Sequence, residues 1–126
     1  MQERLDADKG APPVGPYSPA VRANGLIFTS GQIPLNPETG EIVGDSIQDQ
    51  VRQALENLKT LLEAAGSSLD KAVKCTVYLQ DLHDFEPMNE IYATYFNGEV
   101  PPARSTIQVA RLPKGVDVEI DVIALE

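Results

Sequence analysis

The middle of the chain carries a hydrophobic pattern with helical spacing. Between Ser46 and Gly66, apolar residues recur every three or four positions on one stripe. The stripe consists of Ile47, Val51, Ala54, Leu55, Leu58, Leu61, Leu62 and Ala65. This spacing predicts an amphipathic helix. Ser46 followed by Asp49 resembles a capping box at its start, and Gly66 suits a left-handed stop at its end.

A second, shorter stripe begins after Asp84 and predicts another helix with one buried face. Its apolar residues are Met88, Ile91, Tyr92, Tyr95 and Phe96. Pro87 is compatible with this helix because it lies in the first turn, where its missing N–H is not needed. Gly98 and the proline pair at 101–102 mark the end of the helix.

Strands are predicted where the apolar period changes to two. Residues 20–23 and 26–33 flank Asn24-Gly25, a pair that favours the tight turn of a hairpin. Residues 73–80 alternate in the same way, with Val73, Cys75, Val77 and Leu79 on the apolar side. The first 19 residues contain four prolines and predict an extended, turn-rich entry.

Two further strands, at 105–111 and 116–125, give the order β-β-α-β-α-β-β and a single α+β domain over residues 1–126. Each helix has one apolar stripe, so both are expected on one face of the sheet. The last strand is apolar on one face and mixed on the other, where Asp117, Glu119 and Asp121 alternate. The second face of the sheet therefore needs a partner, and we expect a homo-oligomer.

Charge narrows the range of partners. Nineteen acidic and ten basic residues give a net charge of −9. Such a field repels phosphate backbones and anionic lipids, so nucleic acid and membrane surfaces are not expected partners, whereas a small anion can still bind at a local cation. The lone Cys75 cannot form an intramolecular disulfide, and no run approaches the roughly 18 apolar residues of a membrane span. We expect a cytoplasmic protein.

Familiar catalytic motifs are absent, so two charged residues become the candidates. No phosphate-binding loop, dinucleotide fingerprint or zinc motif occurs, and His83 and Cys75 are interpreted as structural. Arg104 follows a proline bend at the start of a strand, where it can grip a carboxylate by two hydrogen bonds or form an ordinary ion pair. Glu119 lies within an apolar strand, facing either a site or an exposed acidic surface.

Two further residues, Gly31 and Tyr17, each allow more than one structural interpretation. Gly31 within a predicted strand indicates a bulge, a simple bend, or a place where the backbone approaches a ligand closely. Tyr17 in the proline-rich entry either presents its phenol to a cleft or fills a gap.

Several separated motifs, taken in order, resemble the reactive-intermediate deaminase family from about Gly15 to Ala124. They are Gly15-Pro16-Tyr17-Ser18, Thr29-Ser30-Gly31-Gln32-Ile33-Pro34, Asn36-Pro37, Thr39-Gly40, Pro102-Ala103-Arg104-Ser105, Val109-Ala110-Arg111-Leu112-Pro113 and Val118-Glu119-Ile120. The resemblance implies a chorismate-mutase-like fold assembled as a homotrimer with clefts between subunits. It also implies hydrolysis of enamines and imines, such as 2-aminoacrylate and 2-iminopropanoate, to 2-keto acids and ammonia, without cofactor or metal.

The same resemblance assigns roles to residues. Arg104 would bind the substrate carboxylate, and Glu119 would position water or move protons. The cleft would be lined by Tyr17, Ser30, Gly31, Phe85, Asn89 and Thr106, with the Gly31 N–H helping to hold the carboxylate. Some family members carry cysteine where this chain has Thr106. The alternatives are a regulatory trimer that binds 2-keto acids without turnover, and a ribonuclease, which the negative charge argues against.

Overall fold

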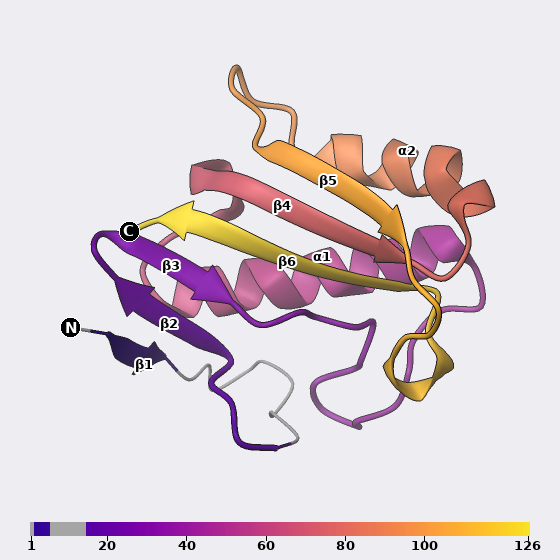
Figure 1. Cartoon of the computed structure of the whole chain (residues 1–126), viewed down its shortest axis with the longest axis horizontal. Helices are drawn as coiled ribbons and strands as arrows, with labels where there is room; N and C mark the ends of the chain where they lie inside the picture. The colour runs from indigo at the N-terminus through magenta and orange to yellow at the C-terminus, as the bar shows by residue number, and fades with distance from the viewer. Residues whose placement is uncertain (1, 6–14) are drawn as a thin grey trace.

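The computed structural model describes residues 2–5 and 15–126 as one sheet with two helices behind it (Figure 1). The strands are β1 (Glu3–Leu5), β2 (Ala20–Ala23), β3 (Leu26–Thr29), β4 (Ala72–Leu79), β5 (Ala103–Gln108) and β6 (Val118–Leu125). The helices are α1 (Ile47–Ala64) and α2 (Phe85–Tyr95), and 3-10 turns occur at Leu69–Lys71, Leu82–Asp84 and Pro113–Gly115. The strand order is β1-β2-β3-β6-β4-β5, and β4 and β5 are parallel neighbours connected through α2.

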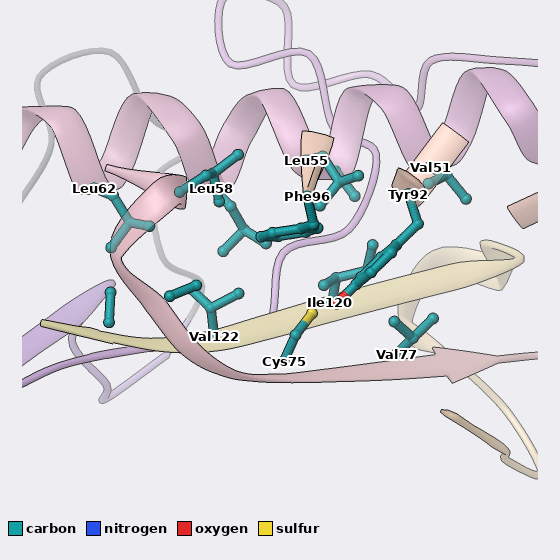
Figure 2. Packing of buried hydrophobic residues seen from close by; sticks show 14 of the residues in the cluster. Val51, Leu55, Leu58, Leu62, Cys75, Val77, Tyr92, Phe96, Ile120 and Val122 are labelled. Atoms are coloured by element: carbon teal, nitrogen blue, oxygen red, sulfur yellow. The ribbon is translucent and has the colours of Figure 1, made fainter. Parts of the chain in front are cut away.

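Both helices pack on the same face of the sheet, as their single apolar stripes predicted (Figure 1). Between them and the sheet lies a core in which Leu55 and Leu58 of α1 meet Phe96, Cys75 and Ile120 (Figure 2). The Ser46 hydroxyl accepts a hydrogen bond from the Asp49 N–H at 3.1 Å, which confirms the predicted helix cap. The mixed α+β fold predicted from the pattern is therefore the fold of the described chain.

The hairpin is confirmed, but its second strand is shorter than predicted. Asn24 and Gly25 have φ of 52° and 78°, as a tight primed turn requires. The strand predicted to reach Ile33 ends at Thr29. There the Thr29 hydroxyl accepts a hydrogen bond from the Val122 N–H and donates one to the Val122 carbonyl, so a side chain takes the place of the backbone ladder. Farther on, only a single bridge joins Gln32 to Ile120.

The start of β4 also differs from the predicted alternation. A register irregularity between Ala72 and Lys74 turns the Val73 side chain outward, where it is 42% exposed, and buries Ala72 instead. A bulge of this kind places two residues of one strand opposite a single residue of the neighbouring strand. The side chains on the N-terminal side of the bulge then point to the other face of the sheet. Cys75, Val77 and Leu79 are buried as predicted.

The structure also adds one strand and shifts the ends of two others relative to the sequence prediction. The structure adds β1, which pairs with β2 in the segment for which the sequence predicted only an extended, turn-rich entry. The rest of that prediction, at 6–14, lies outside the described residues. Strand β5 spans Ala103–Gln108 in place of 105–111, and β6 begins at Val118 because the Pro113–Gly115 turn extends the connection.

The face of the sheet opposite the helices carries large apolar side chains. Phe28 is 40% exposed and Ile107 is 44% exposed on this face. This pattern agrees with the expectation of a partner, which stays a prediction for a single chain. Within the described segments, neither helix has the length and hydrophobicity needed to cross a bilayer.

Candidate functional site

Arg104 lies on the helix-facing side of β5, the strand at one edge of the sheet. In the parallel ladder it is paired with Cys75, whose side chain is fully buried beneath α2. Thr106, two residues along, is paired with the buried Val77 and shares this face. The edge of the sheet therefore places Arg104 beside α2 while leaving it only partly buried.

Three side chains of α2 surround the Arg104 guanidinium. Phe85, Asn89 and Tyr92 are spaced by four and three residues, which puts them on one face of the helix. Asn89 Oδ1 accepts a hydrogen bond of 2.7 Å from Arg104 Nη1. The guanidinium carbon lies 4.6 Å from the centre of the Tyr92 ring and 5.4 Å from that of Phe85, within the range of cation–π attraction.

Arg104 has no acidic partner within the described ranges. In contrast, Arg22 and Arg52 each form an ion pair with a carboxylate. Its planar fork of N–H donors is bonded to a single amide oxygen. An oriented guanidinium with unused donors is suited to a carboxylate from outside the chain. The arrangement therefore favours a ligand-binding arginine over a structural ion pair.

Beneath this arginine are buried polar atoms with few partners. The Tyr92 hydroxyl and the Thr106 hydroxyl make no hydrogen bond to a nitrogen or oxygen of the described chain. The Tyr92 hydroxyl instead points toward the Cys75 thiol, a weak partner (Figure 2). Burial raises the pKa of Cys75 to about 12, so this thiol stays protonated at neutral pH. That agrees with its interpretation as an inert core residue.

Glu119 occupies the opposite face of the sheet. In β6 it is paired with Tyr78, whose side chain lies on the uncovered face, whereas its neighbours Val118 and Ile120 are buried on the helix side. Burial, and secondarily the charge of Asp121, raises the pKa of the Glu119 carboxyl above its ordinary value of 4.5. Glu119 is thus a half-buried acid that holds its proton more tightly than an exposed glutamate.

Gly31 lies against Glu119. A Cβ atom built on Gly31 would be 2.8 Å from the carboxyl carbon of Glu119 and 3.0 Å from its Cγ, closer than real contacts allow. The sequence left a bulge, a simple bend or a close approach to a ligand open for Gly31. The structure places Gly31 between the end of β3 and the bridge at Gln32, close to a side chain of the same protein, and its approach to a ligand stays a prediction. Ser30 donates a hydrogen bond of 2.6 Å to the Ser18 carbonyl, and Tyr17 is 44% exposed in the adjoining segment.

The predicted site residues therefore form two groups. One group lies between α2 and the edge strand β5 and consists of Arg104, Phe85, Asn89 and Thr106. The other group, on the opposite face of the sheet, consists of Glu119 and Gly31. Because Arg104 and Glu119 project from opposite faces of one sheet, a single chain does not bring them to the same small molecule.

Sequence reasoning missed two neighbours of these groups, Tyr92 and Tyr78. Tyr92 was counted only as core, although its spacing from Phe85 and Asn89 was a usable signal. Tyr78 adjoins Glu119 through the β4–β6 register, which the sequence did not reveal, whereas Asp121 shares the face of Glu119 as the alternation had predicted. Across the described part of the chain, no cluster of three metal-ligating side chains occurs, and His83 is an exposed side chain paired with Asp81.

The chain thus combines an α+β fold with an arginine, at one edge of its sheet, that has no acidic partner among the described residues. Residues 8–126 match the family described as Endoribonuclease L-PSP. The chain is 53% identical, over 98% of both chains, to a RutC family protein of Pyrococcus horikoshii. It is 46% identical, over 98% of its length and 65% of that protein, to Reactive Intermediate Deaminase A, chloroplastic, of Arabidopsis thaliana.

The crystal structure of E. coli TdcF with bound serine has a TM-score of 0.92 and 44% identity to this chain, and the match covers 98% of each. The chain therefore belongs to the reactive-intermediate deaminase family, as its motifs indicated.

Proposed function

We propose that this protein is a deaminase for small enamines and imines that carry a carboxylate beside the reacting carbon, such as 2-aminoacrylate and 2-iminopropanoate. The observation that carries the proposal is the Arg104 guanidinium, held by Asn89 and Tyr92 with no acid of its own in the described chain. A relative is named a reactive intermediate deaminase, and the related TdcF structure contains bound serine, a small molecule with a carboxylate.

The reaction needs orientation more than a strong nucleophile, because such imines already hydrolyse in water. Arg104 binds the substrate carboxylate, while Phe85 and Thr106 flank it. Water adds to the imine carbon, and the carbinolamine then releases ammonia and leaves the 2-keto acid. Glu119 serves the proton transfers, with the Gly31 backbone, Ser30 and Tyr17 on its side of the cleft.

Arg104 and Glu119 can act together only if different copies supply them. We propose a homotrimer in which Arg104 of one subunit faces Glu119 of the next, giving three equivalent clefts. A head-to-tail contact of this type closes into a ring when its rotation allows. The exposed Phe28 and Ile107 on the uncovered sheet face support such a contact.

A coupled assay tests the activity. Threonine dehydratase generates the imine, and release of 2-ketobutyrate is followed with and without this protein. The protein should accelerate release, and Arg104→Ala should abolish the acceleration while sedimentation still shows a trimer. An unchanged rate with the unmodified protein would overturn the enzymatic proposal.

Mixed assemblies test the shared cleft. Arg104→Ala and Glu119→Gln chains, each inactive alone, are co-expressed with different tags and purified as mixed trimers. If each cleft takes one residue from each neighbour, every mixed trimer has one boundary that joins an intact Arg104 to an intact Glu119, so about one third of the clefts recover. No recovery in verified mixed trimers would contradict the shared cleft.

One observation favours a second candidate, a trimer that binds 2-keto acids without turnover. Phe85, Asn89 and Tyr92, which together form the Arg104 cradle, all come from the same chain as Arg104, whereas Glu119 is separated from them. Binding of 2-ketobutyrate that Arg104→Ala removes, with no deaminase activity and indifference to Glu119→Gln, would support this candidate. The ribonuclease named by the family description has no such support, since the chain carries a net charge of −9.

A further inference from the structure

The residues that follow β3, at 30–35, form a segment that carries Gly31 past Glu119; we call it the Gly31 segment. Within the described chain, one backbone bridge joins this segment to β6. In that bridge the Gln32 N–H donates to the Ile120 carbonyl at 2.8 Å, and the Ile120 N–H donates to the Gln32 carbonyl at 3.0 Å. The bridge is next in sequence to both Gly31 and Glu119. The position of the segment therefore sets the close contact between these two residues.

Beyond the bridge, a side chain of α1 holds the segment in place of the backbone ladder. Asn57 Nδ2 donates a hydrogen bond of 3.2 Å to the Ile33 carbonyl and one of 2.8 Å to the Leu35 carbonyl. These carbonyls lie on either side of Pro34, a residue without an N–H of its own. One amide group thus fastens two positions of the Gly31 segment to the helix.

The Asn57 amide is itself fixed in orientation. Asn57 is 3% exposed, and its Oδ1 accepts a hydrogen bond of 2.9 Å from Gln53 Nε2, one helical turn earlier. An asparagine side chain offers two N–H donors and one carbonyl oxygen, and here all three have partners. A shift of the segment would leave some of these buried polar groups without a partner, which is costly. Asn57 therefore holds the segment in one arrangement.

Apolar packing alone does not account for an asparagine at this place. The residues three positions before it and four positions after it on α1 are Ala54 and Leu61, which belong to the buried apolar core. A buried polar residue on such a face is favoured only when its hydrogen bonds are made. The bonds that Asn57 makes lead to the segment that carries Gly31.

We infer that Asn57 is a positioning residue that fixes the Gly31 segment against Glu119 for the proposed reaction. The inference rests on the proposed function and makes it more specific, because it gives a buried residue of α1 a role in catalysis. Asn57 holds Ile33 and Leu35. Gly31 in turn limits where the Glu119 carboxyl lies. Loss of the Asn57 amide should let the segment move and the Glu119 carboxyl with it.

Hydrogen exchange in the full-length protein tests the anchoring without relying on catalysis. Asn57→Ala should speed amide exchange in peptides covering 29–35 by roughly fivefold or more, because the segment opens more often. Ser67→Ala is the matched control. It removes a buried hydroxyl that donates to the Leu125 carbonyl at 2.5 Å, at the other end of β6, and should leave exchange at 29–35 unchanged. Unchanged exchange in Asn57→Ala, or an equal rise in both variants, would overturn the inference.

A second variant keeps the test decisive if Asn57→Ala fails to fold. Gln53→Ala removes only the hydrogen bond that orients the Asn57 amide, and Gln53 is partly exposed. Exchange at 29–35 should rise by roughly two- to threefold in this variant. Unchanged exchange would contradict the anchoring given to the Asn57 amide.

The coupled assay supplies the catalytic readout. In Asn57→Ala, kcat should fall roughly five- to fiftyfold, because displacement of a reacting group by about 1 Å can cost about a hundredfold in rate. Binding of 2-ketobutyrate at Arg104 should change by less than about threefold, since the Arg104 cradle is left intact. Ser67→Ala should preserve both.

Three outcomes of the assay would contradict the inference or its basis. An unchanged kcat despite faster exchange would refute the positioning role, and an equal loss of kcat in Asn57→Ala and Ser67→Ala would assign the effect to stability instead. An inactive unmodified protein would refute the proposed function, whereas the exchange result would still decide whether Asn57 holds the Gly31 segment.

Discussion

The carboxyl group of Glu119 lies directly on the backbone of Gly31. The position occupied by the carboxyl carbon is only 2.8 Å from where a Cβ on Gly31 would be. The backbone of Gly31 does not need the left-handed conformation, so glycine is required here for space and not for a turn. This contact fixes where the acid of the proposed cleft is held.

Gly31→Ala should therefore displace Glu119 and impair catalysis without unfolding the protein. A shift of about 1 Å in a reacting group can cost about a hundredfold in rate. We expect a roughly ten- to hundredfold lower kcat in the coupled assay, with an unchanged circular dichroism spectrum. Gly98→Ala is the control, because its added Cβ meets no atom within 4 Å. Equal activity of the two variants would show that the Glu119 position tolerates movement.

Asn89 controls the orientation of Arg104. Asn89→Ala removes the 2.7 Å hydrogen bond to Nη1 but keeps the positive charge and both aromatic rings. We expect KM to rise roughly ten- to hundredfold with a smaller change in kcat, since a hydrogen bond to a charged group is worth about 1.5–3 kcal/mol and about 1.4 kcal/mol is a factor of ten. Asn97→Ala, which removes only a contact with the Thr94 carbonyl, is the control. A loss confined to kcat would contradict a role in carboxylate binding.

The aromatic ring of Tyr92 matters more than its hydroxyl. The hydroxyl is buried without a nitrogen or oxygen partner in the described chain, so Tyr92→Phe should change the free energy of unfolding by less than about 1 kcal/mol. Tyr92→Leu removes the ring beneath Arg104 and should weaken 2-ketobutyrate binding by about two- to fivefold. Urea denaturation and calorimetry measure these two effects. Weaker binding in Tyr92→Phe would show that the hydroxyl itself supports Arg104.

The sequence predicted the structure correctly wherever the spacing of nearby residues determines it. The stripe from Ile47 to Ala65 predicted α1 and its buried face, and Asn24-Gly25 predicted the hairpin. These features depend on contacts within a few residues. The Arg104 cradle could have been predicted from local spacing as well, because Phe85, Asn89 and Tyr92 share one helix face.

What the sequence missed depends on partners distant in the chain. The end of β3 is set by hydrogen bonds between Thr29 and Val122, and the outward turn of Val73 by a bulge against β6. The separation of Arg104 from Glu119 likewise follows from strand register, which decides the face of every side chain. Motif order alone could place both residues in one site but could not assign them to opposite faces.

The raised pKa of Glu119 should also appear in the stability of the protein. Between the ordinary value of 4.5 and its raised value, the folded chain holds a proton that the unfolded chain has lost. Stability contributed by this group is therefore present below pH 4.5 and lost as the pH rises through the raised pKa. Glu119→Gln has no charge to bury, so this variant should be more stable than the unmodified protein at pH 7.5.

The difference between Glu119→Gln and the unmodified protein should shrink toward zero at pH 4. Urea denaturation at both pH values measures it, at one fixed protein concentration because an assembly would make stability concentration-dependent. A gain of the same size at pH 4 would mean that glutamine simply packs better. A loss at pH 7.5 would mean that the ionised Glu119 has a stabilising partner in the assembled protein, in which case its proton would be held less tightly than the single chain indicates.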